Sequence, residues 1–266
     1  MPLVFTILGS GSSAGVPRVV QGWGACDPAN PKNRRRRCSL LVERIDGDKR
    51  TTVLVDTSPD LREQLLDADV KKLDGVLFTH DHADHTHGID DLRPVFIHHR
   101  RRVDVYLDEI TSSVVRPRFA YCFSSPDGSE YPPILEEHRI AAGKTVTISG
   151  EGGEVSAMPF RQRHGTGETL GFRFGDLAYS CDVSDVPDES LPALAGLDVW
   201  ILDALRYKPH PSHFSLDEAL AWIERVRPRR AVLTNLHTDL DYETLRRALP
   251  PSVEPAYDGM KIALAR

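Results

Sequence analysis

One stretch of the sequence carries most of its recognisable chemistry: Phe78-Thr79-His80-Asp81-His82-Ala83-Asp84-His85-Thr86-His87-Gly88. Four histidines and two aspartates follow directly on the apolar run at 75–78. Imidazole and carboxylate groups are ligands that zinc, manganese and iron accept. A short apolar run of this kind is typical of a buried strand. The stretch therefore predicts metal ligands where a strand ends.

The spacing within this stretch predicts two adjacent metal positions. Alternation of an extended backbone sends His80 and His82 to the same side. Asp84 and His85, where the chain turns away, can face a second position. A polar loop of solvated histidines would explain one or two of these residues, but not HxHxDH as a unit.

Length and composition indicate an ordinary α/β enzyme. The 266 residues can bury a substantial core, apolar residues make up 40% and charged residues 27%. The formal charge of -6 argues against a general nucleic-acid coat. The N-terminus has no basic region before its short apolar run, and no later run approaches a membrane span. Four scattered cysteines without CxxC indicate reduced thiols, so we expect a cytoplasmic protein without a membrane partner.

The first half of the chain predicts strands, a helix and the strand that delivers the cluster. Residues 3–8 are expected to form a strand, and residues 39–44 and 51–55 a hairpin around Asp46-Gly47-Asp48. Ser58 is expected to cap a helix that has Pro59 at its first position. Residues 74–78 form the strand before the cluster.

The second half repeats strands that end on a carboxylate or a histidine. Strands are expected at 154–160, 171–182 as a hairpin, 199–202 and 231–233. The residues at or after their ends are His164, Asp182, Asp203 and His237. Taken singly, each is more often a structural hydrogen-bonding group. Ser215 and Glu218 form a capping box for a helix at 216–226, and His213 stands just before it.

The motif resembles that of the metallo-β-lactamase-fold hydrolases. The longer pattern Thr79-His80-x-His82-Ala83-Asp84-His85-x-x-Gly88-Ile89-Asp90-Asp91-Leu92-Arg93 is similar to their PhnP-like cyclic-phosphodiesterase branch. The resemblance implies an α/β protein with a metallo-β-lactamase-type αβ/βα four-layer sandwich and two mixed β-sheets. We expect residues 1–266 to form one such domain, with the first glycine-rich loop bordering a dinuclear site.

The resemblance also implies a ligand set. His80, His82 and His164 would hold the first metal, Asp182 would bridge, and Asp84 and His85 would hold the second metal together with His237. The branch usually has histidine directly after Leu-Thr, where this chain has Asn235. His237 is expected to replace it, because residues 235 and 237 of an extended segment face the same side. His213 resembles the family histidine that acts on substrate, so the catalytic residues are expected to be His213 and Asp84.

This reading predicts a metal-dependent phosphodiesterase. The cofactors are expected to be two divalent ions, Mn²⁺ or Zn²⁺, which lower the pKa of a bound water and generate an attacking hydroxide. The charges of Asp84 and Asp182 would reduce the four positive charges of two such ions to about two, and a bridging hydroxide would reduce them to about one. This remaining charge suits a monoanionic phosphodiester. The expected partner is a small or cyclic phosphodiester or a nucleotide. A homodimer is left open.

Other functions stay open at this point. A tRNA 3′-processing endoribonuclease shares HxHxDH and a histidine like His213, although no long arm for gripping tRNA is visible and nucleic acid is not the favoured partner. A thioester or lactam hydrolase would leave His213 without a role. Non-enzyme alternatives are an iron redox protein or a metal-binding module without turnover. The basic run 32–37 is expected to be solvated surface or a phosphate-binding patch, and no structural zinc is expected around Cys26 and Cys38.

Overall fold

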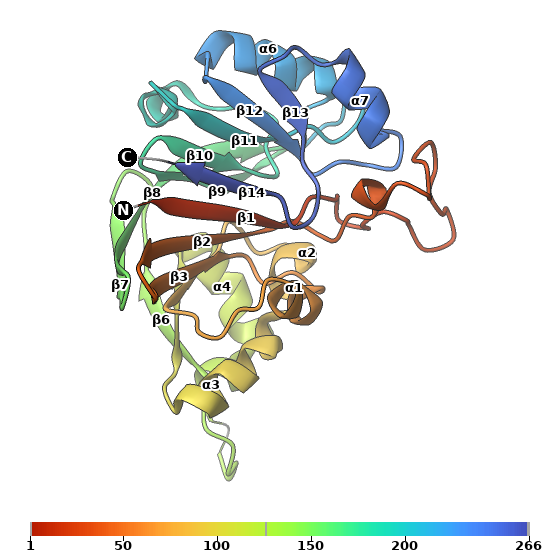
Figure 1. Cartoon of the computed structure of the whole chain (residues 1–266). Coiled ribbons are helices and arrows are strands. Elements are labelled where there is room, and N and C mark those ends of the chain that lie inside the picture. The colour runs from red at the N-terminus through yellow and green to blue at the C-terminus, as the bar shows by residue number, and fades with distance from the viewer. Residues whose placement is uncertain (1, 126, 265–266) are drawn as a thin grey trace.

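The computed structural model describes residues 2–125 and 127–264, which build two seven-stranded sheets that face each other (Figure 1). The first sheet contains, in spatial order, β14 (Lys261–Leu264), β1 (Leu3–Gly9), β2 (Ser39–Asp46), β3 (Lys49–Val55), β4 (Gly75–Leu77), β5 (Val103–Leu107) and β6 (Leu135–Arg139). The second contains β13 (Val253–Pro255), β12 (Arg230–Thr234), β11 (Val199–Asp203), β10 (Leu177–Ser180), β9 (Gly167–Phe174), β8 (Gly153–His164) and β7 (Val146–Gly150).

Both sheets are mixed, and both change direction in the same way. In the first sheet β14, β1, β2 and β3 pair antiparallel, and β3, β4, β5 and β6 pair parallel. In the second sheet β7 to β10 pair antiparallel, and β10 to β13 pair parallel. Antiparallel strands can be joined by tight turns, whereas parallel strands need longer crossovers. The expected pair of mixed sheets is confirmed.

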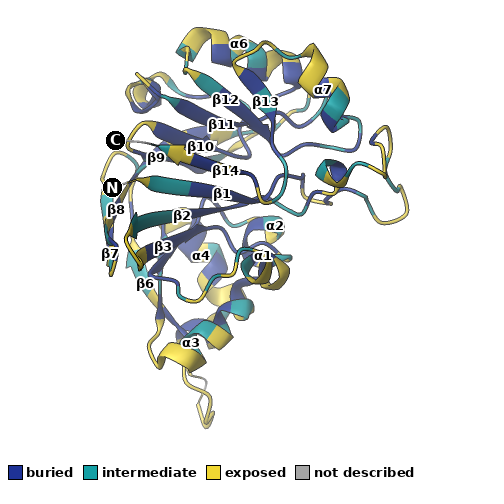
Figure 2. Cartoon of the chain, in the orientation of Figure 1, coloured by how far each residue is buried: buried dark blue, intermediate teal, exposed yellow. Residues whose placement is uncertain are grey.

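Helices cover the outer face of each sheet. In Figure 1, α1 to α4 lie in the lower half of the molecule, on the side of the first sheet, and α6 and α7 lie above the second. Figure 2 shows exposed residues on the outward faces of these helices and buried residues along the strands. The helices are α1 (Leu61–Asp67), α2 (Ala83–Thr86), α3 (Arg93–His99), α4 (Glu109–Arg118), α5 (Ala120–Phe123), α6 (Leu216–Val226) and α7 (Tyr242–Ala248), with short 3₁₀ turns at Pro31–Asn33, Ile89–Leu92 and Asp188–Leu194.

Three apolar clusters correspond to the three interfaces between these layers. Phe5, Val42 and Phe172 belong to the cluster between the two sheets. A second cluster joins the first sheet to its helices, and a third packs α6 and α7 on the second sheet, with Trp200 fully buried in it. Burial of apolar side chains on both faces of each sheet explains the continuous apolar runs of β3, β4, β11 and β12. The predicted αβ/βα four-layer sandwich is confirmed.

The capping chemistry was predicted correctly for one helix and wrongly for another. Ser215 and Glu218 form the expected capping box of α6. The first helix begins at Leu61 after Asp60, not after Ser58. The Ser58 hydroxyl donates to Gln64 Oε1 instead, because the buried Gln64 amide holds that loop against Arg37.

The basic run is solvated only in part, because Arg34 is exposed but Arg35 is buried. It lies in a long segment that extends sideways from the sheets (red to orange at the right of Figure 1). Arg35 is 2% exposed, and its guanidinium donates to the backbone oxygens of His237 and Leu240. Arg36 pairs with Asp258 and Arg37 with Asp60. These arginines therefore fasten the insertion to the body of the protein.

Among the described residues, none of the helices combines the length and the apolar character that crossing a bilayer requires.

Candidate metal centre

The site lies where strands from both sheets end. His80, His82, Asp84 and His85 follow β4 of the first sheet, His164 ends β8 of the second, and Asp182 follows β10. Three buried residues here have left-handed backbones, namely Asp56 (φ 64°), Asp182 (φ 46°) and Asn235 (φ 62°). Asp and Asn tolerate this conformation better than most residues. It turns the chain sharply as β3, β10 and β12 end, so that polar side chains replace the apolar alternation of the strands.

A first group of candidate ligands consists of three histidines and one aspartate. Its ligand atoms, one each from His80, His82, His164 and Asp182, all lie within 4.8 Å of one another. Asp182 Oδ2 lies 3.7 Å from His80 Nε2 and 3.8 Å from His164 Nε2. His82 is exposed, whereas the other three are buried or nearly so. Three imidazoles and one carboxylate can hold a zinc-like ion.

A second group shares Asp182 with the first. It consists of Asp84, His85 and Asp182, with ligand atoms again within 4.8 Å of one another. His85 Nε2 lies 3.5 Å from Asp84 Oδ2 and 3.3 Å from Asp182 Oδ1. The two oxygens of Asp182 thus face different groups, which is the arrangement of a bridging carboxylate.

Outer partners hold three of the histidines with Nε2 toward the centre. His80 Nδ1 contacts the Thr79 hydroxyl at 3.0 Å, His85 Nδ1 contacts Asp56 at 2.7 Å, and His164 Nδ1 contacts the Ser212 carbonyl at 2.7 Å. Such partners fix the tautomer of metal-binding histidines. The Nε2 atoms of His80 and His85 are buried and have no hydrogen-bond partner among the described residues. Buried nitrogens are rarely left unpaired, so these two fit coordination of a cation.

The electrostatics of the group also favour a cation. Burial, followed by the charge of His85, holds the pKa of His80 well below its usual value, so its imidazole is neutral and able to coordinate. Burial alone would lower the pKa of His85, but Asp182, Asp84 and Asp56 outweigh it and raise that pKa well above its usual value. His85 also helps to hold the pKa of Asp182 well below its usual value against burial. Three carboxylates around the His85 imidazole therefore create a negative potential that favours binding of a cation.

His213 lies beside the centre but belongs to neither group. Its Nδ1 contacts the buried Asp203 Oδ2 at 2.8 Å, and its Nε2 lies 4.0 Å from Asp182 Oδ2. Burial opposes protonation, but Asp203 outweighs it and raises the pKa of His213 to about 9. Asp203 also fixes the ring, because the contact directs Nε2 toward the centre.

His237 is not brought to the centre. None of the candidate groups among the described residues contains it, and its Nδ1 faces Asp239 Oδ1 at 3.1 Å. The expectation of an extended segment from 235 to 237 is wrong. The left-handed backbone of Asn235 ends the alternation, and the Leu236 amide donates to the Ser10 carbonyl. It is Asn235 that contacts the centre, with Nδ2 3.1 Å from Asp182 Oδ1.

The sequence interpretation missed two further residues of the site, Asp56 and Asn235, and gave Asp203 no role. Asp56 accepts from the Thr79 amide and hydroxyl as well as contacting His85. Its signal in the sequence was the apolar run at 53–55 that ends on a carboxylate, as at Asp203. Asn235 stands directly after Leu-Thr, where the branch usually has histidine, and this position was the sequence feature that could have identified it.

An open groove leads to the second group. It has a volume of about 400 Å³, and its walls include Asp84, Ala83, Arg18 and Ser13. Arg18 donates to Ser12 and Gln21, and among the described residues no carboxylate lies within ion-pair distance of it. The glycine-rich loop after β1 therefore borders the site, as expected.

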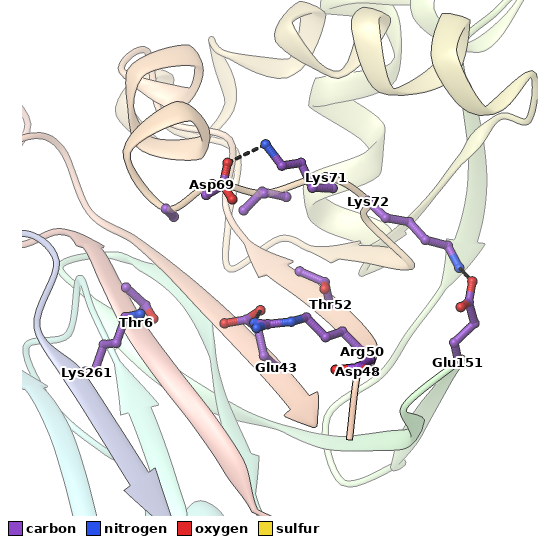
Figure 3. A pocket seen from close by; sticks show the side chains of 12 residues that line it. Thr6, Glu43, Asp48, Arg50, Thr52, Asp69, Lys71, Lys72, Glu151 and Lys261 are labelled. Carbon is purple, nitrogen blue, oxygen red and sulfur yellow. Dashed lines mark hydrogen bonds and ion pairs between the residues drawn. The ribbon is translucent and has the colours of Figure 1, made fainter. Parts of the chain in front are cut away.

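A second groove, of about 500 Å³, contains many charges but no candidate ligand (Figure 3). Arg50 pairs with Glu43, Lys71 with Asp69, and Lys72 with Glu151. Its charges are therefore largely satisfied by one another, so we place the functional site at the strand ends.

Comparison with known proteins defines first the class and then the family. The family model described as beta-lactamase superfamily domain matches residues 51–235, so the chain belongs to the beta-lactamase superfamily. More narrowly, the chain belongs to the PhnP family. It is 37% identical to a solved structure described as a new diphosphatase from that family, with a TM-score of 0.89 and coverage of 99% of this chain and 98% of the other.

Two further similar proteins carry other names. A Porphyromonas gingivalis protein named octanoyltransferase is 34% identical over 260 residues, which are 96% of this chain but 50% of that protein. The chain thus spans about half the length of this curated relative. Zn²⁺-bound PqqB from Methylobacterium extorquens shares the fold, with 17% identity, a TM-score of 0.75, and coverage of 97% of this chain and 99% of the other.

Proposed function

We propose that this metallo-β-lactamase-fold protein is a dinuclear hydrolase of small or cyclic phosphodiesters, ribose cyclic phosphates included. The observation that carries the proposal is the position of Asp182 between two ligand groups, with one carboxylate oxygen toward each. His80, His82 and His164 would hold one ion, and Asp84 and His85 the other. His237 has no part in this proposal.

The charge of such a centre suits a phosphodiester. Two bound divalent ions would supply Lewis-acid stabilisation and an activated water. Asp84 and Asp182 would offset two of their four charges, so about two positive charges would remain for a substrate anion. Arg18 in the adjoining groove adds a further cation on the approach to Asp84.

The role we assign to His213 is that of general acid. Asp203 holds its Nδ1, so the proton available for donation is the one on Nε2, which faces the centre. A departing alkoxide is strongly basic, and a positioned acid typically contributes about 10²–10⁴-fold to such a step. The buried Asp203 orients the ring and stabilises its charged form.

A second candidate is hydrolysis of the anhydride bond of a small diphosphate. It is favoured by the 37% identity to the protein described as a diphosphatase. A phosphate leaving group is far less basic than an alkoxide. Cleavage of a diphosphate should therefore depend much less on His213 than cleavage of a cyclic phosphodiester does.

A substrate panel tests both candidates. The Mn²⁺-loaded or Zn²⁺-loaded chain would be assayed with 2′,3′-cyclic nucleotides, a nitrophenyl phosphodiester, nucleoside diphosphates, a phosphomonoester, a thioester, a β-lactam and a precursor tRNA. We expect turnover of the cyclic nucleotides. Dominant turnover of the diphosphates would select the second candidate, and dominant thioester, lactam or precursor-tRNA cleavage would reject both.

The variant His213→Ala separates the roles of the residue. We expect kcat on a cyclic nucleotide to fall by about 10²-fold or more, with a smaller loss on the activated nitrophenyl ester, whose leaving group needs no acid. Metal content should not change. His98→Ala, an exposed histidine on α3, is the control and should leave both rates unchanged. Equal losses on both esters would contradict proton donation.

A further inference from the structure

Asn235 lies against the second ligand group. The residue is 2% exposed and follows β12 directly. Its Nδ2 donates to Asp182 Oδ1 at 3.1 Å. That oxygen is the one that lies 3.3 Å from His85 Nε2, whereas Oδ2 faces His80 and His164. The amide of Asn235 therefore lies beside the Asp182 oxygen that faces the second ligand group.

The hydrogen bonds around Asn235 conflict in this orientation of the amide. Nδ2 also lies 3.2 Å from His213 Nδ1. That ring nitrogen contacts Asp203 Oδ2 at 2.8 Å and therefore carries a proton. Two donors face each other there, so only Asp182 benefits from the amide nitrogen. An oxygen in the same place could accept from His213.

A cation at the second group would change which end of the Asn235 amide suits Asp182. Without the cation, the carboxylate needs a donor, and the amide nitrogen supplies one. With a cation bound, Oδ1 of Asp182 would coordinate it and would no longer need that donor. Exchange of the amide oxygen and nitrogen would then put an oxygen 3.1 Å from Asp182 Oδ1. Two neighbouring oxygen ligands of an octahedral ion with bonds of about 2.1 Å lie roughly 3.0 Å apart, so this separation suits coordination.

We propose that Asn235 Oδ1 is the fourth protein ligand of the second ion, and that this makes the second site harder than the first. This inference rests on the two-ion centre of the proposed function. The second site would offer three oxygens, from Asp84, Asp182 and Asn235, and one imidazole, whereas the first offers three imidazoles and one carboxylate. Oxygen ligands suit Mn²⁺ and Mg²⁺, and imidazoles suit Zn²⁺. The site would thus discriminate between metals by position.

Metal titration of three variants tests the assignment. Asn235→Gly removes the side chain and tolerates the left-handed backbone. Asn235→Asp keeps an oxygen, and Asn235→His supplies the imidazole that the branch usually has. The full chain would be stripped with chelator and dialysed against Mn²⁺ or Zn²⁺, with bound metal measured by elemental analysis and Mn²⁺ also by electron paramagnetic resonance. Thermal unfolding of the stripped proteins would show that each variant folds.

The expected results differ between the two sites. The wild type binds two Mn²⁺. Asn235→Gly binds the first as tightly as the wild type and the second more than ~100-fold more weakly, which exceeds the ~10–100-fold loss that removal of an outer-sphere partner causes. Asn235→Asp keeps two Mn²⁺, and Asn235→His raises the ratio of Zn²⁺ to Mn²⁺ affinity at the second site.

Two results would overturn the inference. If Asn235→Gly binds its second Mn²⁺ as tightly as the wild type, Asn235 is not a ligand. If the wild type binds only one Mn²⁺, there is no second ion for Asn235 to hold, and the two-ion centre of the proposed function fails together with the inference. None of these titrations contains a substrate, so failure of the phosphodiesterase proposal would leave their results unchanged.

Discussion

At the scale of single residues, the site depends on side chains that orient the candidate ligands through hydrogen bonds. Asp56 is fully buried and contacts the Thr79 backbone amide, the Thr79 hydroxyl and His85 Nδ1. Thr79 in turn contacts His80. One carboxylate outside both ligand groups therefore orients a histidine of each.

Replacement of Asp56 should weaken metal binding without removing a ligand. In Asp56→Asn the negative charge opposite His85 disappears, so His85 is held less firmly. We expect Mn²⁺ affinity to fall by about 10–100-fold, measured by dialysis and elemental analysis. Asp104→Asn is the matched control, because Asp104 contacts a partly exposed histidine, His138, at the same 2.7 Å but on β5 and β6. Equal affinity of Asp56→Asn and the wild type would refute the positioning role.

Gly88 should not tolerate a side chain. A Cβ on this residue would lie 2.0 Å from the Ser58 carbonyl oxygen, and backbone cannot move away cheaply. We expect Gly88→Ala to lower the free energy of unfolding by about 1–3 kcal/mol, as overpacked sites do, and to weaken metal binding through the displaced loop. Gly167→Ala is the control, since its nearest atom would be 3.6 Å away. Urea unfolding of the stripped proteins measures the difference, and similar curves for the two variants would contradict the clash.

At the scale of elements, short helices near the site are fixed by capping and by contacts with the insertion. Asp241 caps α7 by accepting from the Thr244 amide, and it also accepts from Asn33 at 2.6 Å. Arg35 bonds backbone oxygens of the same loop. The insertion thus packs against the loop that follows Asn235, which explains how a segment so rich in Gly, Pro and Arg remains ordered.

The cap of α7 should give a small acid-dependent contribution to stability. Burial alone would raise the pKa of the Asp241 carboxyl. Hydrogen bonds from the Thr244 and Asp27 amides outweigh it and lower the pKa of Asp241 to about 2. A carboxyl whose pKa is lower in the folded state stabilises above its ordinary pKa of about 3.9, and this contribution is lost as pH falls toward 2. Because Asp241 is only partly buried, solvent screening keeps the effect small.

Two variants separate capping from charge. Asp241→Ala should cost about 1 kcal/mol at pH 7, since it removes the cap. Asp241→Asn should cost less at pH 7 and lose the part of the pH dependence that lies between about 4 and 2. Urea unfolding at pH 7, 4 and 3 measures both. Parallel pH profiles for Asp241→Asn and the wild type would show that Asp241 does not titrate in this window.

At the scale of the whole molecule, the centre joins the two sheets. His80, His82, Asp84 and His85 come from the end of β4 in the first sheet, and His164 and Asp182 come from β8 and β10 in the second. A bound ion would therefore connect both halves of the sandwich. Metal affinity and stability should be linked for this reason.

Chelation should lower the thermal midpoint, and Mn²⁺ should restore it. Saturation at one hundred times Kd adds about 2.7 kcal/mol, which corresponds to a shift of several degrees for a chain of this size. His82→Ala should leave the midpoint of the stripped protein nearly unchanged, because His82 is exposed, and should abolish most of the Mn²⁺-dependent rise. His87→Ala, an exposed histidine of the same stretch outside both groups, should keep that rise. An equal rise in both variants would contradict the ligand set.

The sequence by itself determined the four-layer fold, because the HxHxDH stretch after an apolar strand and the strands ending on polar residues identify the superfamily. Through the resemblance of its motifs to the metallo-β-lactamase-fold hydrolases, it also indicated six of the residues that the structure gathers, namely His80, His82, Asp84, His85, His164 and Asp182. Only the tertiary structure showed that Asn235, and not His237, contacts Asp182, because the left-handed backbone at Asn235 is a property of the turn and not of the residue order. It also revealed Asp56 behind His85 and Arg35 inside the protein, since partners distant along the chain meet only when both sheets are in place.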